Sequence, residues 1–131
     1  MNSDDLLAHP ATREFDVAVL GFSRFERAGQ LASFRMSSAL SVSFRAVDDV
    51  CAADFIVVDT EDLAAVRSIV AAGRVHEAIF VGNGAPAEAM CWIHRPIDAR
   101  RLLRGLTALV EDDEEEIATS RASNFSPLSV F

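Results

Sequence analysis

The sequence predicts a single α/β domain, a three-layer α/β/α sandwich with a five-stranded parallel sheet. Five short apolar runs of strand length alternate with segments whose apolar residues recur at helical spacing or are too short for a full helix. Such alternation is typical of a parallel sheet with right-handed crossovers and helices on both faces. The chain has 131 residues, which is the size of one domain with its own core.

The first strand is predicted over residues 16–20, where the valine-rich run DVAVL ends at Gly21. Ser23 and Glu26 have the spacing of a capping box, which predicts a helix start directly after the strand. We expect this helix to turn one apolar face toward the sheet. That face would consist of Phe25, Ala28, Leu31, Ala32 and Met36.

The second and third strands differ in their patterns. Residues 40–47 alternate apolar and polar side chains, which indicates an edge strand with one buried face. Residues 54–59 contain the run FIVV, which is apolar at every position and predicts a central strand covered on both faces. Only residues 48–53 separate the two strands, so the second helix of the domain is expected to be abbreviated.

Thr60 is the predicted cap of the next helix, which ends at Gly73. Its inward face would carry Leu63, Val66, Ile69 and Val70. Residues 78–81 (AIFV) form the predicted fourth strand, which ends in the loop Gly82-Asn83-Gly84. An abbreviated fourth helix is expected over residues 85–90.

The last strand is predicted over residues 91–94 (CWIH), and Asp98 then caps a final helix. This helix would turn inward Leu102, Leu103, Leu106, Leu109 and Val110. The acids of residues 111–116 would lie at its carboxyl end, where the helix dipole disfavours negative charge, so we expect the helix to end there.

The domain is therefore expected to span residues 15–111, after an N-terminal extension of residues 1–14. Residues 112–131 are predicted to be an acidic, serine-rich, flexible tail. The tail carries Phe125, Leu128, Val130 and Phe131. These apolar residues leave open that the tail docks on the domain or on a partner.

Charge and hydropathy limit the possible partners. The formal net charge is −8, but six of the 20 acids lie in residues 111–116 and the remaining 14 face 12 basic residues. This near balance argues against binding of nucleic acid or of an anionic membrane. No apolar run is long enough to cross a bilayer and the amino terminus does not look like a secretory signal, so we expect a cytoplasmic protein. Cys51 and Cys91 are predicted to be buried free thiols.

The run WIHRPID over residues 92–98, together with Asp59, resembles the receiver domains of two-component response regulators. In that family the third strand ends in the phosphoacceptor aspartate, and the last strand ends in Lys-Pro before an aspartate-led helix. Asp59 takes the phosphoacceptor position, Arg95 takes the lysine position, and Trp92 takes the place of the aromatic residue that rotates between activity states. The resemblance covers residues 16–110 and implies a CheY-like, flavodoxin-like fold with strand order 2-1-3-4-5.

The departures from the family pattern concern its phosphorylation chemistry. Gly21 and Phe22 stand where two adjacent acids hold a magnesium ion, and Gly82 stands where a threonine or serine contacts the phosphoryl group. Arg95 brings a planar guanidinium in place of a compact ammonium, although the chain contains no lysine and a general drift toward arginine would explain this exchange as well. We therefore expect the magnesium site to be lost, no cofactor, and Asp59 to be inactive as a phosphoacceptor.

Other candidate sites have simpler interpretations. Neither Asp48 nor Glu26 has a spacing that makes it a substitute magnesium ligand. The loop Gly82-Asn83-Gly84 could form an anion-binding nest, but a plain turn is the simpler interpretation. Cys91 and His94 have metal-like spacing, but they lie in a predicted strand without a second ligand pair. No catalytic constellation is recognisable, so we do not expect an enzyme.

The sequence thus favours an atypical receiver-like module of a two-component or related pathway that acts through protein–protein contact without phosphorylation. The expected partner is a histidine kinase, an output domain or a regulator, and a homodimer is possible. The interface candidates are Trp92, Arg95, Arg100, Arg101 and Arg104. Two alternatives stay open: a small-ligand or nucleotide sensor in the crevice at the strand carboxyl ends, enlarged at Gly21 and Gly82, or a receiver weakly phosphorylated at Asp59.

Overall fold

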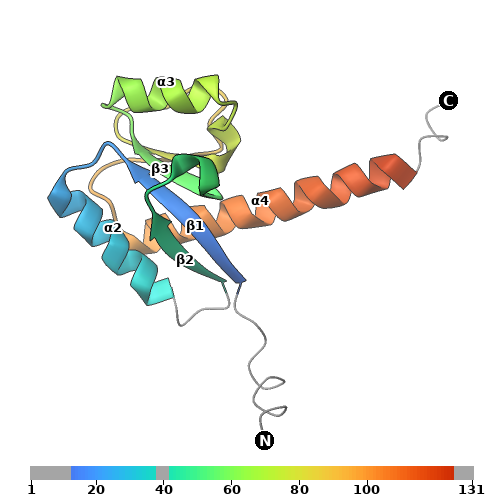
Figure 1. Cartoon of the computed structure of the whole chain (residues 1–131), viewed down its shortest axis with the longest axis horizontal. Helices are drawn as coiled ribbons and strands as arrows, with labels where there is room; N and C mark the ends of the chain where they lie inside the picture. Colours follow the sequence, from blue (N-terminus) through green and yellow to red (C-terminus); the bar gives the residue numbers. More distant parts are fainter. Residues whose placement is uncertain (1–12, 38–41, 126–131) are drawn as a thin grey trace, which may run out of the picture.

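The computed structural model describes residues 13–37 and 42–125, with side chains as far as residue 112. Five parallel strands form one sheet in the order β2-β1-β3-β4-β5 (Figure 1). The strands are β1 (Arg13–Leu20), β2 (Val42–Val47), β3 (Phe55–Asp59), β4 (Ala78–Val81) and β5 (Cys91–Ile93). This is the flavodoxin-like arrangement that the sequence predicts.

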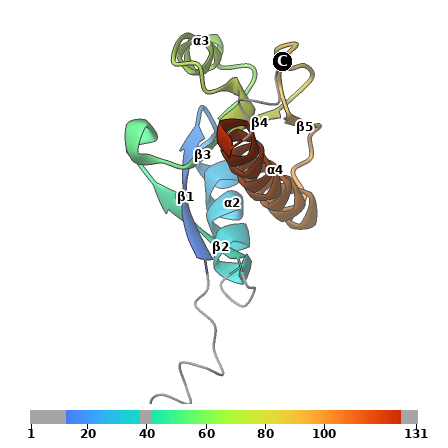
Figure 2. The same ribbon diagram turned by 90° about the vertical axis from the view of Figure 1, so that its right-hand side faces the viewer.

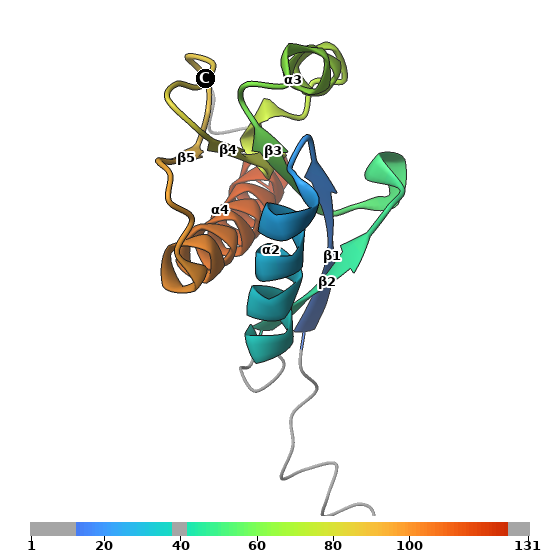
Figure 3. The same ribbon diagram turned by 90° about the vertical axis from the view of Figure 1, so that its left-hand side faces the viewer.

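The helices form the two outer layers of the sandwich. Helices α2 (Arg24–Met36) and α4 (Ala99–Phe125) lie on one face of the sheet, and α3 (Leu63–Ala71) lies on the other (Figures 2 and 3). Between β2 and β3 the chain makes only the 3-10 turn Val50–Ala52, and between β4 and β5 it forms no helix. The predicted abbreviation of these two connections is therefore confirmed, but the short helix expected over residues 85–90 does not form.

Successive residues of the central strands supply two separate cores. On the side of α2 and α4 the buried cluster includes Val57 and Leu106, and on the side of α3 it includes Ile56, Val58 and Phe80. This division follows from the pleat, which points neighbouring side chains to opposite faces. All five residues of β3 are buried and β2 is an edge strand, as the sequence predicts.

The abbreviated connection between β2 and β3 is held by Arg74, which directly follows α3 in the chain. Arg74 donates to the carbonyl oxygens of Val50 and Ala53 at 2.6 and 2.5 Å, and its Nε donates to Glu77 at 2.5 Å. Its side chain is only 18% exposed. These hydrogen bonds satisfy backbone carbonyls that a full helix would have satisfied internally.

Helix α2 does not bury the face that its apolar residues predict. Phe25 is 87% exposed and Met36 is 63% exposed, whereas Gln30, Ser33 and Phe34 are buried. Two anchors set this rotation: Phe34 enters the core beside α4, and the Ser37 hydroxyl that follows the helix accepts from the backbone of β2. The small Ser33 donates to a carbonyl of its own helix and permits close packing.

Helix α3 starts two residues later than predicted. Its cap is Asp62, whose carboxylate accepts from the Ala65 N–H at 3.1 Å, and not Thr60. This shift leaves Leu63 and Val70 60% and 49% exposed. The inward face consists of Ala65, Val66 and Ile69. The end of the helix at Gly73, which has φ of +71°, is as predicted.

Helix α4 continues to Phe125, so the predicted end near Val110 is wrong. Alanine and glutamate have high helix propensities, and in the longer helix the acids no longer lie at its carboxyl end. The inward leucines are confirmed, with Leu102 and Leu106 fully buried. Gly105 permits a close approach to β4 and β5, because a Cβ at this position would lie 2.9 Å from the Cys91 Sγ.

Parts of the predicted extension and tail lie outside the described residues, which begin at residue 13 and end at residue 125. The domain boundaries, the flexibility of residues 112–131 and docking of the tail stay predictions. Within the described ranges, no helix combines the length and the hydropathy that crossing a bilayer requires.

Candidate functional site

The structure brings Asp59 and Arg95 together at the carboxyl edge of the sheet. Asp59 ends β3 and Arg95 follows β5, two strands that flank β4. Arg95 Nη2 donates to Asp59 Oδ2 at 2.8 Å, and Nη1 donates to Oδ1 at 3.4 Å. The side chains are 29% and 12% exposed. The two residues that carry the receiver resemblance therefore form a shielded ion pair.

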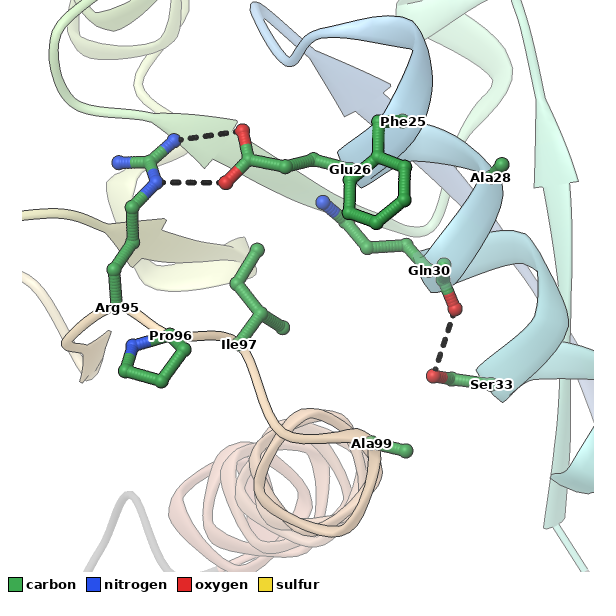
Figure 4. A pocket seen from close by; sticks show the side chains of 10 residues that line it. Phe25, Glu26, Ala28, Gln30, Ser33, Arg95, Pro96, Ile97 and Ala99 are labelled. Carbon is green, nitrogen blue, oxygen red and sulfur yellow. Dashed lines mark hydrogen bonds and ion pairs between the residues drawn. The ribbon is translucent and has the colours of Figure 1, made fainter.

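Glu26 binds the same guanidinium from the first turn of α2. Arg95 Nε donates to Glu26 Oε2 at 2.8 Å and Nη2 donates to Oε1 at 3.1 Å, a bidentate pair (Figure 4). The Ser23 hydroxyl accepts from the Glu26 N–H and fixes the start of α2, which confirms that half of the predicted capping box. The sequence places Glu26 in a capping box and offers no spacing argument for it as a magnesium ligand, and it does not predict the pairing with Arg95.

The network holds a firmly charged guanidinium among carboxylates. The hydrogen bonds of Glu26 and then of Asp59 raise the pKa of Arg95 above its ordinary value. Glu61, which is exposed, approaches Nη1 at 3.7 Å. On its remaining side the guanidinium faces the ring of Phe22, whose centroid lies 5.8 Å from Cζ. Phe22, which the resemblance aligns with a magnesium ligand of the receiver family, therefore contacts the Arg95 guanidinium.

Asp59 also organises the turn that follows β3. Its Oδ1 accepts from the Glu61 N–H at 2.9 Å, and its carbonyl oxygen accepts from the Asp62 N–H at 3.0 Å. Both carboxylate oxygens of Asp59 therefore have donors within the folded chain. These two structural roles, pairing with Arg95 and shaping the turn, explain an aspartate at this position without a role in phosphoryl transfer.

The position of Gly21 has no room for a metal-binding carboxylate. Gly21 has φ of +84°, and a Cβ there would lie 2.8 Å from the Asp62 Cβ and 3.3 Å from the Asp59 Cβ. Among the residues whose side chains are described, no group of three or more His, Cys, Asp or Glu could hold a metal ion. Because Mg²⁺ needs an octahedral oxygen shell and the Asp59 oxygens already accept from Arg95, these residues do not fit the family's magnesium ion.

Thr60 fills the space beside Gly82, a contact that the sequence did not indicate. A Cβ at Gly82 would lie 2.1 Å from Thr60 Oγ1, and the nearest Arg95 nitrogen would be 3.6 Å away. The Thr60 hydroxyl donates to the Val81 carbonyl at 3.2 Å. A hydroxyl therefore stands beside the position where the family has one, supplied by the neighbour of Asp59. The two glycines do not enlarge the crevice, since Asp62 and Thr60 occupy the space.

Trp92, at the aromatic-switch position, is tied to Gly82. Its Nε1 donates to the Gly82 carbonyl at 2.9 Å, and the Gly82 N–H donates to the Ile93 carbonyl at 3.0 Å. The indole lies 4.5 Å from the ring of His94, centroid to centroid, and Trp92 is 45% exposed. The side chain thus has one hydrogen-bonded end and one open face.

The remaining predicted residues lie outside this network. Arg100, Arg101 and Arg104 are exposed along the first turns of α4. Cys91 is partly buried, and desolvation raises the pKa of its thiol. Both cysteines are free, but Cys51 is exposed because it lies in the short turn where a buried helix was abbreviated, so its predicted burial is wrong. Asp48 pairs with Arg27 at 3.1 Å, and His94 is exposed beside Trp92.

Comparison of the chain with models of known protein families, with curated proteins and with solved structures gave no match. The receiver resemblance therefore depends on the residues named above and on a strand order that is compatible with that family.

Proposed function

We propose that this chain is an atypical receiver-like signalling module that acts through protein–protein contact, without phosphorylation and without turnover of its own. The observation that carries the proposal is the pairing of Arg95 with both Asp59 and Glu26. A permanent guanidinium supplies the positive charge that metal and lysine supply in a phosphorylated receiver. The module is thereby held in one charge state.

The chemistry of phosphoryl transfer supports this proposal. An attacking carboxylate needs a free lone pair in line with phosphorus, and a metal ion that neutralises the developing charge. Here the Asp59 oxygens accept from Arg95 and from the Glu61 N–H. Attack by Asp59 would remove the carboxylate charge that these hydrogen bonds depend on, and no metal would neutralise the charge that develops on the phosphoryl group.

The proposed contact surface is the exposed side of β5 and α4. Trp92 offers a half-exposed aromatic face, and Arg100, Arg101 and Arg104 are exposed on α4. Aromatic and arginine side chains are enriched at protein interfaces. We propose a cytoplasmic histidine kinase, output domain or regulator as the partner, or a second copy of the chain, and neither nucleic acid nor a membrane.

Intact mass spectrometry tests the absence of phosphorylation. The chain is incubated with acetyl phosphate and Mg²⁺, beside a receiver domain that retains its acidic pair as the positive control. We expect an unchanged mass for this chain. Addition of one phosphoryl group that is lost in Asp59→Asn would overturn the proposal in favour of the weakly phosphorylated receiver.

Sedimentation analysis tests the contact surface in its simplest form, the homodimer. We expect self-association that the double variant Arg101→Glu/Arg104→Glu weakens. The matched control is Arg67→Glu, an exposed arginine of α3 on the opposite face of the sheet. A dimer that is equally sensitive to both changes would exclude the α4 surface as the interface.

A further inference from the structure

A cavity of about 820 Å³ lies between α2 and the segment that joins β5 to α4. Its walls include Phe25, Gln30, Ser33, Pro96, Ile97 and Ala99, and the Glu26–Arg95 pair closes one side (Figure 4). The volume falls within the range of pockets that hold small molecules. The proposed function does not use this cavity, which lies on the outer side of the Arg95 network.

Gln30 lines this cavity and has a buried amide without a partner among the described residues. The residue is 1% exposed, and neither Nε2 nor Oε1 makes a hydrogen bond within the described part of the chain. Its side chain extends from α2 into the space between the helix and the segment that carries Arg95 and Ile97 (Figure 4). Buried amides in folded proteins are nearly always satisfied, so this amide indicates a missing binding partner.

The other polar groups of the cavity are already paired. Both Glu26 carboxylate oxygens accept from Arg95, and the Ser33 hydroxyl donates to the Gly29 carbonyl at 3.0 Å. The unfilled hydrogen-bonding capacity therefore consists of one amide donor and one amide acceptor side by side. An anionic ligand would find no free cation here, because Arg95 is already shared by Glu26 and Asp59.

The remaining walls are apolar. Ala28, Pro96, Ile97 and Ala99 offer aliphatic surface, and the exposed ring of Phe25 stands at the rim. Aliphatic walls and an aromatic rim favour a flat, apolar body over a sugar or a phosphate.

We propose that this cavity binds a small neutral planar ligand whose edge carries a donor and an acceptor side by side, as in a carboxamide or the lactam edge of a nucleobase. Both amide atoms are shielded in this structure, so a rotation of the Gln30 side chain would bring them to the cavity surface. The ligand's acceptor would then receive a hydrogen bond from Gln30 Nε2, and its donor would donate to Gln30 Oε1. This proposal does not rest on the proposed function, because phosphorylation and partner contact can fail or hold independently of it.

Nuclear magnetic resonance tests the proposal directly, because Gln30 is the only glutamine in the chain. Its side-chain amide gives one pair of signals beside those of only three asparagines. The full chain is titrated with benzamide as the carboxamide probe and with uracil as the nucleobase probe, each to about 10 mM because fragment-sized ligands bind weakly. N,N-dimethylbenzamide is the matched control, since it keeps the ring and the acceptor but lacks the donor.

We expect at least one probe to shift the Gln30 side-chain signals, and the dimethyl control to bind about tenfold more weakly or not at all. The probe that binds distinguishes the carboxamide from the nucleobase source. Gln30→Leu should fold and lose binding, whereas Ser33→Ala should keep it.

Two results would overturn the proposal. One is the absence of any shift of the Gln30 signals with both probes. The other is equal binding of benzamide and its dimethyl analogue, which would show an apolar cleft without use of the amide. If Gln30→Leu fails to fold, Gly29→Leu replaces it: a Cβ at Gly29 meets no atom within 4 Å, so the side chain can enter the cavity and should abolish binding.

Discussion

Replacement of Arg95 by methionine tests the central ion-pair network. Methionine keeps much of the aliphatic stem but removes every hydrogen bond to Glu26 and Asp59, two of which measure 2.8 Å. Asp59, with a side chain that is 12% exposed, would keep only the Glu61 N–H as a donor among the described contacts. The variant therefore leaves a shielded carboxylate without its counter-charge.

The expected loss lies between two known limits. Exposed ion pairs contribute about 0–1 kcal/mol, and removal of one partner from a fully buried pair costs about 3–5 kcal/mol. Arg95 and Glu26 are each 29% exposed, so solvent screens part of the interaction. We expect Arg95→Met to lower the free energy of unfolding by about 2 kcal/mol, which shifts a urea midpoint by about 1 M.

Urea unfolding followed by circular dichroism measures this loss, with Arg45→Met as the matched control. Arg45 also pairs with an aspartate, Asp16, at 2.8 Å, but its side chain is 60% exposed. We expect a much smaller shift for Arg45→Met because water can replace the lost interaction. A double-mutant cycle of Arg95→Met with Asp59→Asn should give a coupling energy of about 1 kcal/mol or more. Equal shifts for the two arginine variants would refute the reasoning.

Four further outcomes are expected. Gly105→Ala should destabilise the domain by about 1–3 kcal/mol in urea unfolding, because its Cβ would lie 2.9 Å from Cys91 Sγ. The matched change Gly29→Ala in α2 should stabilise the domain by up to about 1 kcal/mol, since a Cβ there meets no atom within 4 Å. Arg74→Lys should cost about 1–3 kcal/mol, because a single ammonium cannot reach both backbone carbonyls that the guanidinium binds, and an unchanged midpoint would contradict this. At neutral pH iodoacetamide should alkylate the exposed Cys51 well before the partly buried Cys91, as peptide mass mapping over time would show. Burial raises the pKa of the Cys91 thiol, so the unfolded state loses its thiol proton at lower pH than the folded state. The free energy of unfolding should therefore fall as pH rises above 9.0, and Cys91→Ala should remove this slope.

The Arg95 network also loses stability as pH rises, but in a much more alkaline range than Cys91. The hydrogen bonds of Glu26 and then of Asp59 raise the pKa of Arg95 above its already strongly basic ordinary value. The stability that its charge contributes is therefore present through the neutral and mildly alkaline range and is lost only as pH rises through that raised pKa. Deprotonation of Arg95 therefore gives no slope between pH 5 and 9, which separates its contribution from that of Cys91 near pH 9.0.

The sheet was predictable because its strands carry a strong signal. The run FIVV is buried on both sides, and the interval before β3 is too short for a helix, so both the central strand and the abbreviated crossover follow from the residues. The final helix was predictable in its inward leucines but not in its length. Its end depends on a balance between helix propensity and the helix dipole, which differ by only tenths of a kcal/mol.

The candidate site was predictable in its positions but not in its pairings. The sequence places Asp59 and Arg95 at strand ends that meet at one edge of the sheet, and their contact follows from parallel topology. The contribution of Glu26 depends on the rotation of α2, and that of Thr60 depends on a helix cap that lies two residues further on at Asp62. Neither rotation nor cap is encoded in a periodic pattern.

The rotation of α2 has the largest consequence for function. A helix that followed its apolar pattern would bury Phe25 and Met36 and turn Gln30 toward solvent, and Glu26, four residues before Gln30, would then face away from Arg95. The observed rotation reverses both: it exposes the two large apolar side chains, and it brings Glu26 to the guanidinium and the amide into the cavity. Exposure of Phe25 and burial of an unpaired amide each oppose folding. Because one rotation produces both costs together with the Glu26–Arg95 pair, the sequence of this face departs from the one that burial of apolar side chains alone would favour.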